Sequence, residues 1–197
     1  MKSIAGVILS GGKSTRMKTD KAFLSLGSRT MIEEVISRLE KKFSKLMIIA
    51  NDREKYARFG IKVIKDIVPD QGPLGGIYTG LVKSDSLYNF IFSCDAPFVN
   101  PDLIDYMIAK AKDFDIIIPK WQDRFEPLHA IYSKNCIEAI KRQLEKNELK
   151  VTNFLQYVKV KVINEKEISR FVSSQPFFAN INTPQDLLTL HSQPSSL

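Results

Sequence analysis

Cysteine and histidine are scarce in this sequence. Its 197 residues contain two cysteines and two histidines, and neither Cys94 nor Cys136 belongs to a Cys-x-x-Cys pair or a Cys/His cluster. The spacing therefore gives no structural metal site and predicts reduced thiols.

Long apolar runs are absent as well. No stretch approaches the ~20 uninterrupted apolar residues that a membrane helix requires. The apolar stretch near the N-terminus is short and leads directly into a glycine turn, unlike a signal peptide. The sequence therefore predicts a cytoplasmic protein with no membrane partner.

Acidic residues are too few to balance the basic ones, and the net charge is +7. In the stretches RLEKKFSK and VKVKVINEKE, however, the basic residues alternate with acidic or apolar ones, as they do on solvated faces of helices and strands. Scattered charge of this kind argues against a nucleic-acid partner. The same excess suits a small polyanionic substrate.

Short apolar runs alternate with helical periods along the chain, whose 44% apolar residues suffice for a core. Expected strands lie at 3–10, 45–51, 61–66, 88–95, 115–120, 128–133 and 159–163, and expected helices at 30–43, 74–83, 101–112, 134–146, 152–158, 165–171 and 185–190. Most strands are rich in Ile and Val, which is typical of a parallel sheet covered on both faces. The pattern predicts one doubly wound α/β domain over residues 1–191, with a frayed tail at 192–197 and ligands at the carboxyl ends of the strands.

The stretch SGGKSTRMKTDK follows the first strand and contains the letters GKST of a P-loop. A Walker A motif would need glycine at position 7, which is Val7, and no Gly-x-Gly-x-x-Gly fingerprint follows the strand. Ser10, Gly11 and Gly12 still allow backbone N–H groups to face an anion, and the cations Lys13, Arg16, Lys18 and Lys21 follow. An ordinary glycine turn with surface cations is the alternative.

These residues carry a resemblance. LSGGKSTRMKTDKAFL is similar to the signature LAGG-x-S-x-R-M-G-x-D-K-x-L of a group of nucleotidyltransferases, and most closely to that of the molybdenum cofactor guanylyltransferases. The departures are Ser10 for the usual Ala and Lys18 for the usual Gly. Four further segments resemble family motifs in the family's order: DIVPDQGPLGGI, SCDAPFV, EPLHAIY and FANINTPQDL. Together the five segments span residues 9–187.

The resemblance implies a three-layer Rossmann-like fold with a mostly parallel central sheet and helices on both faces. It implies Mg²⁺-dependent transfer of GMP from GTP to the terminal phosphate of molybdopterin, or of its molybdenum-loaded form, with release of pyrophosphate. Other proteins of molybdenum cofactor biosynthesis and acceptor apo-enzymes are the implied protein partners. The attacking phosphate is already an anion, so alignment and charge neutralisation suffice and no protein nucleophile is needed.

The resemblance also assigns candidate site residues. Arg16, Lys21 and Asp95 are the catalytic candidates, and Asp95, which follows a strand at the carboxyl edge of the sheet, is the candidate Mg²⁺ ligand. Nucleotide binding is expected of Leu9, Ser10, Gly11, Gly12, Lys13, Lys21, Asn51, Asp66, Gly72, Pro73, Leu74, Gly75 and Asp95, and molybdopterin binding of Glu126, Asn180 and Asn182. Ordinary roles remain open for several of them: capping for Asp66, turn formation for Asn51, and loop-ordering hydrogen bonds for Asn180 and Asn182. His129 is interpreted as a structural histidine.

Other functions remain open at this stage. A cytidylyltransferase acting on the same cofactor, or a sugar-phosphate nucleotidyltransferase, would share the glycine loop. A catalytically silent GTP-binding or cofactor-carrier protein would keep the fold, although the presence of Arg16, Lys21 and Asp95 argues against it.

Overall fold

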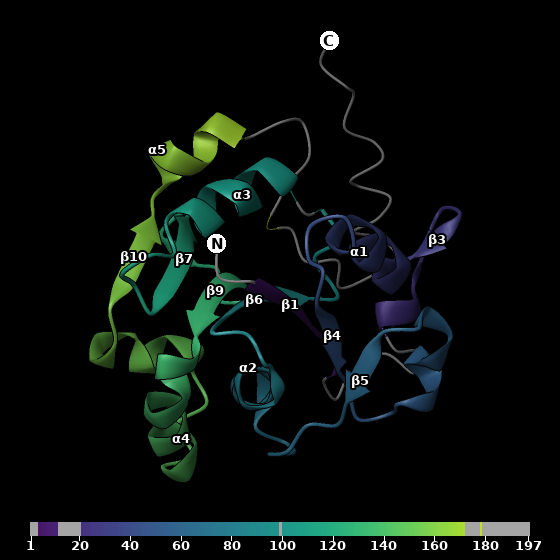
Figure 1. Ribbon diagram of the computed structural model, residues 1–197, viewed down its shortest axis with the longest axis horizontal. Coiled ribbons are helices and arrows are strands. Elements are labelled where there is room, and N and C mark those ends of the chain that lie inside the picture. The colour runs from purple at the N-terminus through teal and green to yellow at the C-terminus, as the bar shows by residue number, and fades with distance from the viewer. Residues whose placement is uncertain (1–3, 12–20, 99, 172–177, 179–197) are drawn as a thin grey trace.

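A mostly parallel sheet forms the centre of the computed structural model, which describes residues 4–11, 21–98, 100–171 and 178. Its strands are β1 (Ile4–Leu9), β4 (Leu46–Ile49), β5 (Lys62–Ile64), β6 (Tyr88–Ser93), β7 (Ile116–Trp121), β9 (His129–Ser133) and β10 (Val160–Ile163), with β8 (Arg124–Phe125) paired to β7. The order across the sheet is β10-β7-β9-β6-β1-β4-β5 (Figure 1). A separate small hairpin joins β2 (Ser25–Leu26) to β3 (Arg29–Thr30).

Along the main path of the sheet, which leaves out β8, one strand runs against the others. β9 is antiparallel to both β6 and β7, whereas β6, β1, β4 and β5 pair in parallel, as do β7 and β10. The strand positions predicted from the sequence are confirmed, but their apolar runs do not distinguish the antiparallel strand, because β9 is buried along its whole length like its parallel neighbours.

Helices cover both faces of the sheet, as predicted. In Figure 1, α1 (Met31–Leu39), α3 (Pro101–Ala109) and α5 (Glu165–Ile168) lie on one face, and α2 (Gly72–Lys83) and α4 (Ile137–Glu145) lie on the other. Short 3₁₀ helices complete the fold: η1 (Lys21–Phe23), η2 (Glu54–Phe59), η3 (Lys134–Cys136), η4 (Val151–Tyr157) and η5 (Ser169–Phe171). A hydrophobic core lies on each face of the sheet, and alternate residues of β1 pack into one or the other. Ile8 packs in the cluster under α1 and α3, whereas Val7 and Leu9 pack in the cluster under α2.

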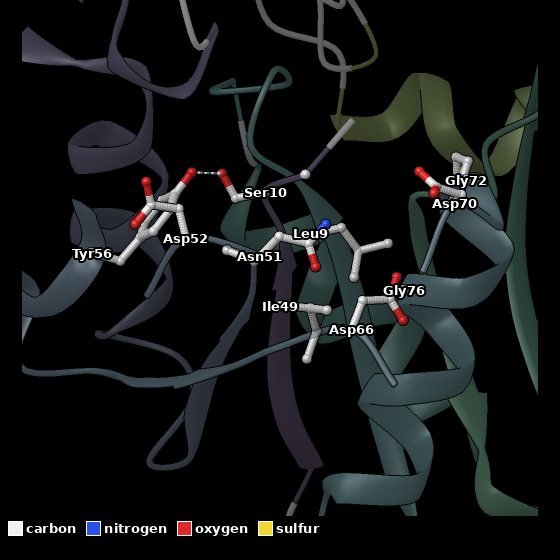
Figure 2. Close-up of a pocket in the computed structure, with 13 residues that line it drawn as sticks. Leu9, Ser10, Ile49, Asn51, Asp52, Tyr56, Asp66, Asp70, Gly72 and Gly76 are labelled. Carbon is white, nitrogen blue, oxygen red and sulfur yellow. Dashed lines mark hydrogen bonds between the residues drawn. The ribbon is translucent and has the colours of Figure 1, made fainter. Parts of the chain in front are cut away.

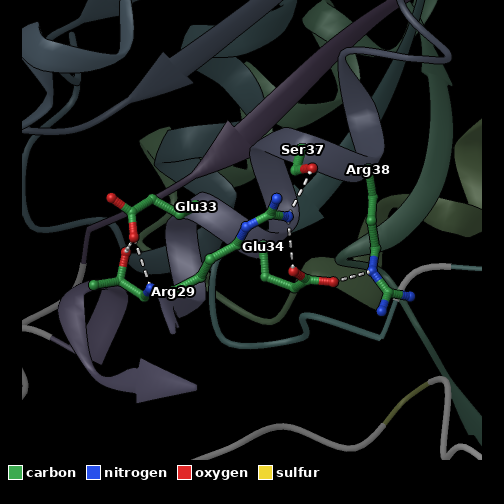
Figure 3. Close-up of polar contacts among 6 residues, drawn as sticks. Arg29, Glu33, Glu34, Ser37 and Arg38 are labelled. Atoms are coloured by element: carbon green, nitrogen blue, oxygen red, sulfur yellow. Dashed lines mark hydrogen bonds and ion pairs between the residues drawn. The ribbon is translucent and has the colours of Figure 1, made fainter. Parts of the chain in front are cut away.

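Helix α1 begins at Met31, one residue after the predicted start, and ends at Leu39 rather than at residue 43. The Glu33 carboxylate accepts hydrogen bonds from the backbone N–H and the hydroxyl of Thr30, at 2.7 and 2.8 Å, which fixes the first turn. These bonds, the backbone one foremost, lower the pKa of Glu33. On the exposed face, Figure 3 shows Glu34 between Arg29 and Arg38, with Arg38 Nε 2.7 Å from the carboxylate. Such exposed pairs orient the side chains and add little stability.

Helix α2 begins at Gly72, two residues before the predicted start, and lies against β1 through its glycines. A Cβ atom on Gly76 would lie 3.2 Å from Leu9 Cδ2, and one on Gly80 would lie 2.8 Å from Val7 Cγ1. The second distance is shorter than a Cβ contact tolerates. Gly80 therefore permits the close approach of helix and strand.

We expect Gly80→Ala to destabilise the protein by about 1–2 kcal/mol, because overpacking outweighs the helix propensity that alanine gains over glycine. Val7 is fully buried in a strand paired on both sides and has a stiff χ1, so it has no room to move. Urea unfolding followed by circular dichroism measures the change. The double variant Val7→Ala/Gly80→Ala should lose less stability than the sum of the single variants; additive losses would contradict the proposed clash.

Among the described residues, no helix is long and apolar enough to cross a membrane.

Candidate active site

A cavity of about 430 Å³ opens at the carboxyl ends of β1, β4 and β5, and we call it the β1–β4 pocket. Its lining comprises Leu9, Ser10, Gly11, Ile49, Ala50, Asn51, Asp52, Tyr56, Asp66, Asp70, Gly72, Pro73 and Gly76. Figure 2 shows Tyr56 and Ser10 on one side, Asp70 and Gly72 on the other, and Leu9 between them. The three strands run in parallel, so their carboxyl ends reach the same edge of the sheet.

Many residues that the sequence nominates for the nucleotide line this pocket. They are Leu9, Ser10, Gly11, Asn51, Asp66, Gly72 and Pro73. Their assembly follows from their positions, because each lies at the end of a parallel strand, just after one, or at the start of α2. Contact with a nucleotide stays a prediction for each of them.

The Asp66 carboxylate is held in one orientation. Its Oδ1 accepts a hydrogen bond of 2.6 Å from the Thr79 hydroxyl and one of 3.1 Å from the backbone N–H of Val68. The Thr79 hydroxyl in turn accepts from the backbone N–H of Ile67 at 3.1 Å, and Thr79 is fully buried. Both donors use the same oxygen, which leaves Oδ2 to serve a ligand.

Tyr56 is a lining residue that the sequence analysis missed. It comes from η2, is 1% exposed, and its hydroxyl lies 2.7 Å from the Ser10 hydroxyl (Figure 2). Its ring also contacts Phe23 in η1, with centroids 5.2 Å apart. Tyr56 thus contacts both the residue before Gly11 and the short helix that begins with Lys21. An aromatic residue in a polar segment gave no signal of this role.

The β1–β4 pocket is acidic. Asp52, Asp66 and Asp70 belong to its lining, with Asp52 ion-paired to Lys55 at 3.5 Å, and no Lys or Arg is among the described lining residues. Carboxylates repel phosphates and accept hydrogen bonds from N–H and O–H groups. The pocket is therefore suited to the base and ribose of a nucleotide, and its triphosphate would have to lie elsewhere. Asp52 and Asp70 were not nominated from the sequence.

Leu74 and Gly75 do not line the pocket. Leu74 is fully buried in the core beneath α2, so its side chain serves packing. Gly75 lies behind Asp66: a Cβ atom there would lie 2.9 Å from the Val68 carbonyl oxygen and 3.3 Å from Asp66 Oδ2. Gly75 therefore leaves room for the Asp66 carboxylate rather than forming the pocket wall.

Asp95 follows β6, the strand beside β1, and lies in the turn that Cys94 begins. The Cys94 backbone N–H donates to the Leu9 carbonyl at 3.1 Å, and the Ser93 hydroxyl donates to Asp95 Oδ1. The carboxylate thus lies at the same edge of the sheet as the pocket, but on the β6 side of β1. In the part of the chain that the structure describes, no three His, Cys, Asp or Glu residues gather as a metal cluster. A single carboxylate fits Mg²⁺, which takes one or two carboxylates and completes its shell with water and phosphate oxygens.

Among the other predicted site residues, the structure describes Lys21 but not those at positions 12–18, 180 and 182. Lys21 is the first residue of η1 and is half-buried. Gly12, Lys13, Arg16, Lys18, Asn180 and Asn182 lie outside the described residues, as do the predicted helix at 185–190 and the predicted tail.

A second cavity, of about 180 Å³, lies at the carboxyl end of β6 on its other side, and we call it the β6–β9 pocket. Its lining comprises Ser93, Ala96, Glu126, Pro127, Leu128, His129 and Phe178. Glu126, nominated from the sequence for molybdopterin, is in this set, and burial raises its pKa to about 7 against the opposing charge of Arg124. Asp95 lies between Ser93 and Ala96 in the sequence, so its backbone adjoins residues that line this second pocket.

Two adjacent pockets at the carboxyl edge of a Rossmann-like sheet lie where α/β proteins of this architecture bind nucleotides. The family model described as the MobA-like NTP transferase domain matches residues 6–160. The chain belongs to this family of nucleotidyltransferases, which confirms the resemblance found in the sequence.

Curated relatives match nearly the whole chain. A protein of Natranaerobius thermophilus named "probable molybdenum cofactor guanylyltransferase" is 40% identical over 94% of this chain and 93% of its own length. One of Desulfosudis oleivorans named "molybdenum cofactor guanylyltransferase" is 32% identical over 95% of this chain and 94% of its own.

Solved structures confirm the predicted fold. Molybdopterin-guanine dinucleotide biosynthesis protein A of Archaeoglobus fulgidus superimposes with a TM-score of 0.82 at 23% identity, covering 94% of this chain and 96% of that protein. 4-Diphosphocytidyl-2C-methyl-D-erythritol synthase of Anaerococcus prevotii gives 0.72 at 15% identity, covering 97% and 95%. Since the second is a cytidylyl enzyme by name, the fold alone does not select the base.

Proposed function

We propose that this enzyme transfers the GMP part of GTP to the terminal phosphate of molybdopterin and releases pyrophosphate. The observation that carries the proposal is the acidic β1–β4 pocket at the end of the glycine-turn strand, in a chain whose relatives carry the guanylyltransferase name. By the same reasoning, the protein would cooperate with other proteins of molybdenum cofactor biosynthesis and with acceptor apo-enzymes.

The acidic lining supports guanine over cytosine. Guanine presents a ring N–H and an amino group side by side, and both can donate hydrogen bonds to a carboxylate. Cytosine presents one amino donor beside two acceptors, which a carboxylate would repel. Asp66, oriented by Thr79, is our candidate for the guanine edge or the ribose hydroxyls, and Asp52 and Asp70 are further acceptors.

The triphosphate would lie beside the glycine turn, outside the acidic pocket. Gly11 lines the pocket at the end of β1, and Gly12, Lys13, Arg16 and Lys21 follow it in the sequence. We assign the anion to backbone N–H groups of the turn and to these cations, whose charges offset those of the phosphates. Asp95, in the turn after the neighbouring strand β6, would hold a divalent cation, with Mg²⁺ as the proposed metal. When bound, Mg²⁺ neutralises charge that develops on the phosphate oxygens.

In the proposed reaction, a terminal phosphate oxygen of molybdopterin forms a bond to the α-phosphorus of GTP. The bond from that phosphorus to the β-bridging oxygen breaks, and the electron pair leaves with pyrophosphate. The attacking oxygen is already negative, so no side chain has to remove a proton from it. The task of the protein is to align the two phosphates and to offset their repulsion.

Pyrophosphate release tests the proposal directly. The purified protein is incubated with Mg²⁺, molybdopterin or its molybdate-loaded form, and each nucleoside triphosphate in turn. We expect product with GTP and at least tenfold less with CTP, because cytosine offers fewer donors to the acidic pocket. Product with CTP alone would contradict the base assignment, and tight GTP binding without any turnover would favour the silent carrier.

A further inference from the structure

The turn between β8 and β9 is a rigid part of the β6–β9 pocket. Its backbone closes through a 3.1 Å hydrogen bond from the N–H of His129 to the Glu126 carbonyl, with Pro127 at the position that proline favours in such turns. The Glu126 N–H donates to the Pro119 carbonyl at 2.9 Å, and the Tyr132 hydroxyl donates to the Pro127 carbonyl at 2.8 Å.

A bond to the neighbouring strand completes this anchoring. The Ser93 N–H donates to the Leu128 carbonyl at 3.2 Å, which ties the turn to the end of β6. The backbone groups named here are thus already in use. The side chains of Glu126 and His129 are the further polar groups that the turn brings to the pocket.

Both side chains have unused capacity. His129 is 4% exposed, and its Nε2 atom is buried without a hydrogen-bond partner among the described residues. Its ring meets Phe90, Phe92 and Phe178 edge-on, at centroid distances of 5.3 to 5.4 Å, so packing fixes its plane. Within the same described part of the chain, the Glu126 side chain makes no hydrogen bond either. A buried polar atom without a partner is unfavourable by about 1–3 kcal/mol, which a ligand can recover.

The pocket is unsuited to a phosphate group. Its described lining holds no lysine or arginine, and Ala96, Pro127, Leu128 and Phe178 make most of its wall apolar. Burial lowers the pKa of His129 to about 4, so the imidazole is neutral at pH 7 and supplies no positive charge. An uncharged flat ring, by contrast, would gain apolar contact on its faces and hydrogen bonds at its edge.

We propose that the β6–β9 pocket binds the ring end of the acceptor substrate: an uncharged nitrogen heterocycle, such as a pterin, hydrogen-bonded at its edge to Glu126 and His129. The inference deepens the proposed function. With the ring in this pocket, the acceptor's phosphate points toward the Asp95 turn between Ser93 and Ala96, and the guanosine occupies the β1–β4 pocket. His129 is then a substrate-binding residue rather than a structural histidine.

Binding of pterin alone, followed by the quenching of its fluorescence, tests the inference without any transfer reaction. The variants are Glu126→Leu and His129→Phe, with Glu138→Leu on the surface of α4 as a control that makes the same Glu-to-Leu change away from the pocket. We expect each of the first two to weaken pterin binding about tenfold, by the loss of one hydrogen bond. Glu138→Leu should bind pterin as the unaltered protein does.

Thermal unfolding separates this role from a structural one. Both pocket variants replace an unpartnered polar group by an apolar one of similar shape, so Tm should stay unchanged or rise. Steady-state assays should give a raised KM for the acceptor and an unchanged KM for GTP.

Three outcomes would overturn the inference: no pterin binding to the unaltered protein, equal binding by both variants, or a lowered Tm that accounts for the loss. Pterin binding without pyrophosphate release would sustain the pocket assignment while contradicting the proposed reaction.

Discussion

Asp95→Asn should lower turnover about a thousandfold, the scale that charge stabilisation of phosphoryl groups reaches in enzymes. Asparagine has the same shape and still accepts the Ser93 hydroxyl, but it carries no charge for a divalent cation. The free energy of unfolding should therefore change little, because the side chain is only half-buried and its hydrogen bond survives. Pyrophosphate release at saturating GTP and Mg²⁺ measures turnover, and urea unfolding measures stability.

A matched control lies at the other end of the same strand. Asp85 is exposed in the turn before β6, so Asp85→Asn removes the same charge far from the carboxyl edge of the sheet and should leave turnover unaltered. Removal of divalent cations with EDTA should stop the unaltered enzyme, and excess Mg²⁺ should restore it. Near-normal turnover of the Asp95→Asn enzyme would remove this carboxylate from the metal site.

Asp66→Asn should raise the KM for GTP about ten- to a hundredfold. Thr79 and the Val68 N–H are both donors, so the amide oxygen of asparagine should take the place of Oδ1 and the amino group that of Oδ2. The asparagine amino group would then face the N–H groups of guanine or the hydroxyls of ribose, where the carboxylate oxygen Oδ2 accepted hydrogen bonds before. Loss of a hydrogen bond to a charged group corresponds to about 1.5–3 kcal/mol, which gives the stated range.

Two comparisons sharpen this result. Inosine triphosphate lacks the amino group of guanine, so a smaller rise in KM for it than for GTP would locate the Asp66 carboxylate at that group. Equal rises would locate it at the ribose or the ring N–H. Thr79→Val keeps the Asp66 carboxylate but removes the hydroxyl that orients it. This variant should raise the KM for GTP less than Asp66→Asn does. A KM for GTP that stays unchanged in Asp66→Asn would contradict any contact of Asp66 with the nucleotide.

Sequence alone predicted the alternation of strands and helices because hydrophobic period is a local property. Met31, Val35 and Leu39 recur at helical spacing, and the apolar runs before Ser10, Asn51 and Asp66 read as strands. The pocket position followed from one further rule, that parallel strands end at one edge of the sheet. Helix ends were less accurate: α1 stops at Leu39 although apolar spacing continues to Phe43.

Partners distant in sequence were beyond prediction. Tyr56 is hydrogen-bonded to Ser10, 46 residues away in the sequence, and Thr79 to Asp66, 13 residues away. These bonds form only when η2 and α2 are packed in the folded protein. The turn that carries Glu126 and His129 faces the end of β6 because β9 runs antiparallel beside it, a direction that its apolar letters do not encode.

The sequence by itself determined the family, the alternating architecture, the glycine turn and the acids that follow the strands, since all of these are local patterns of residue type and spacing. Only the tertiary structure decided that the sheet edge carries two pockets of different chemistry. It also decided that Asp95, in the turn after β6, lies at that same edge. Strand order and direction decide which strand ends become neighbours, and long-range packing of the whole chain sets both.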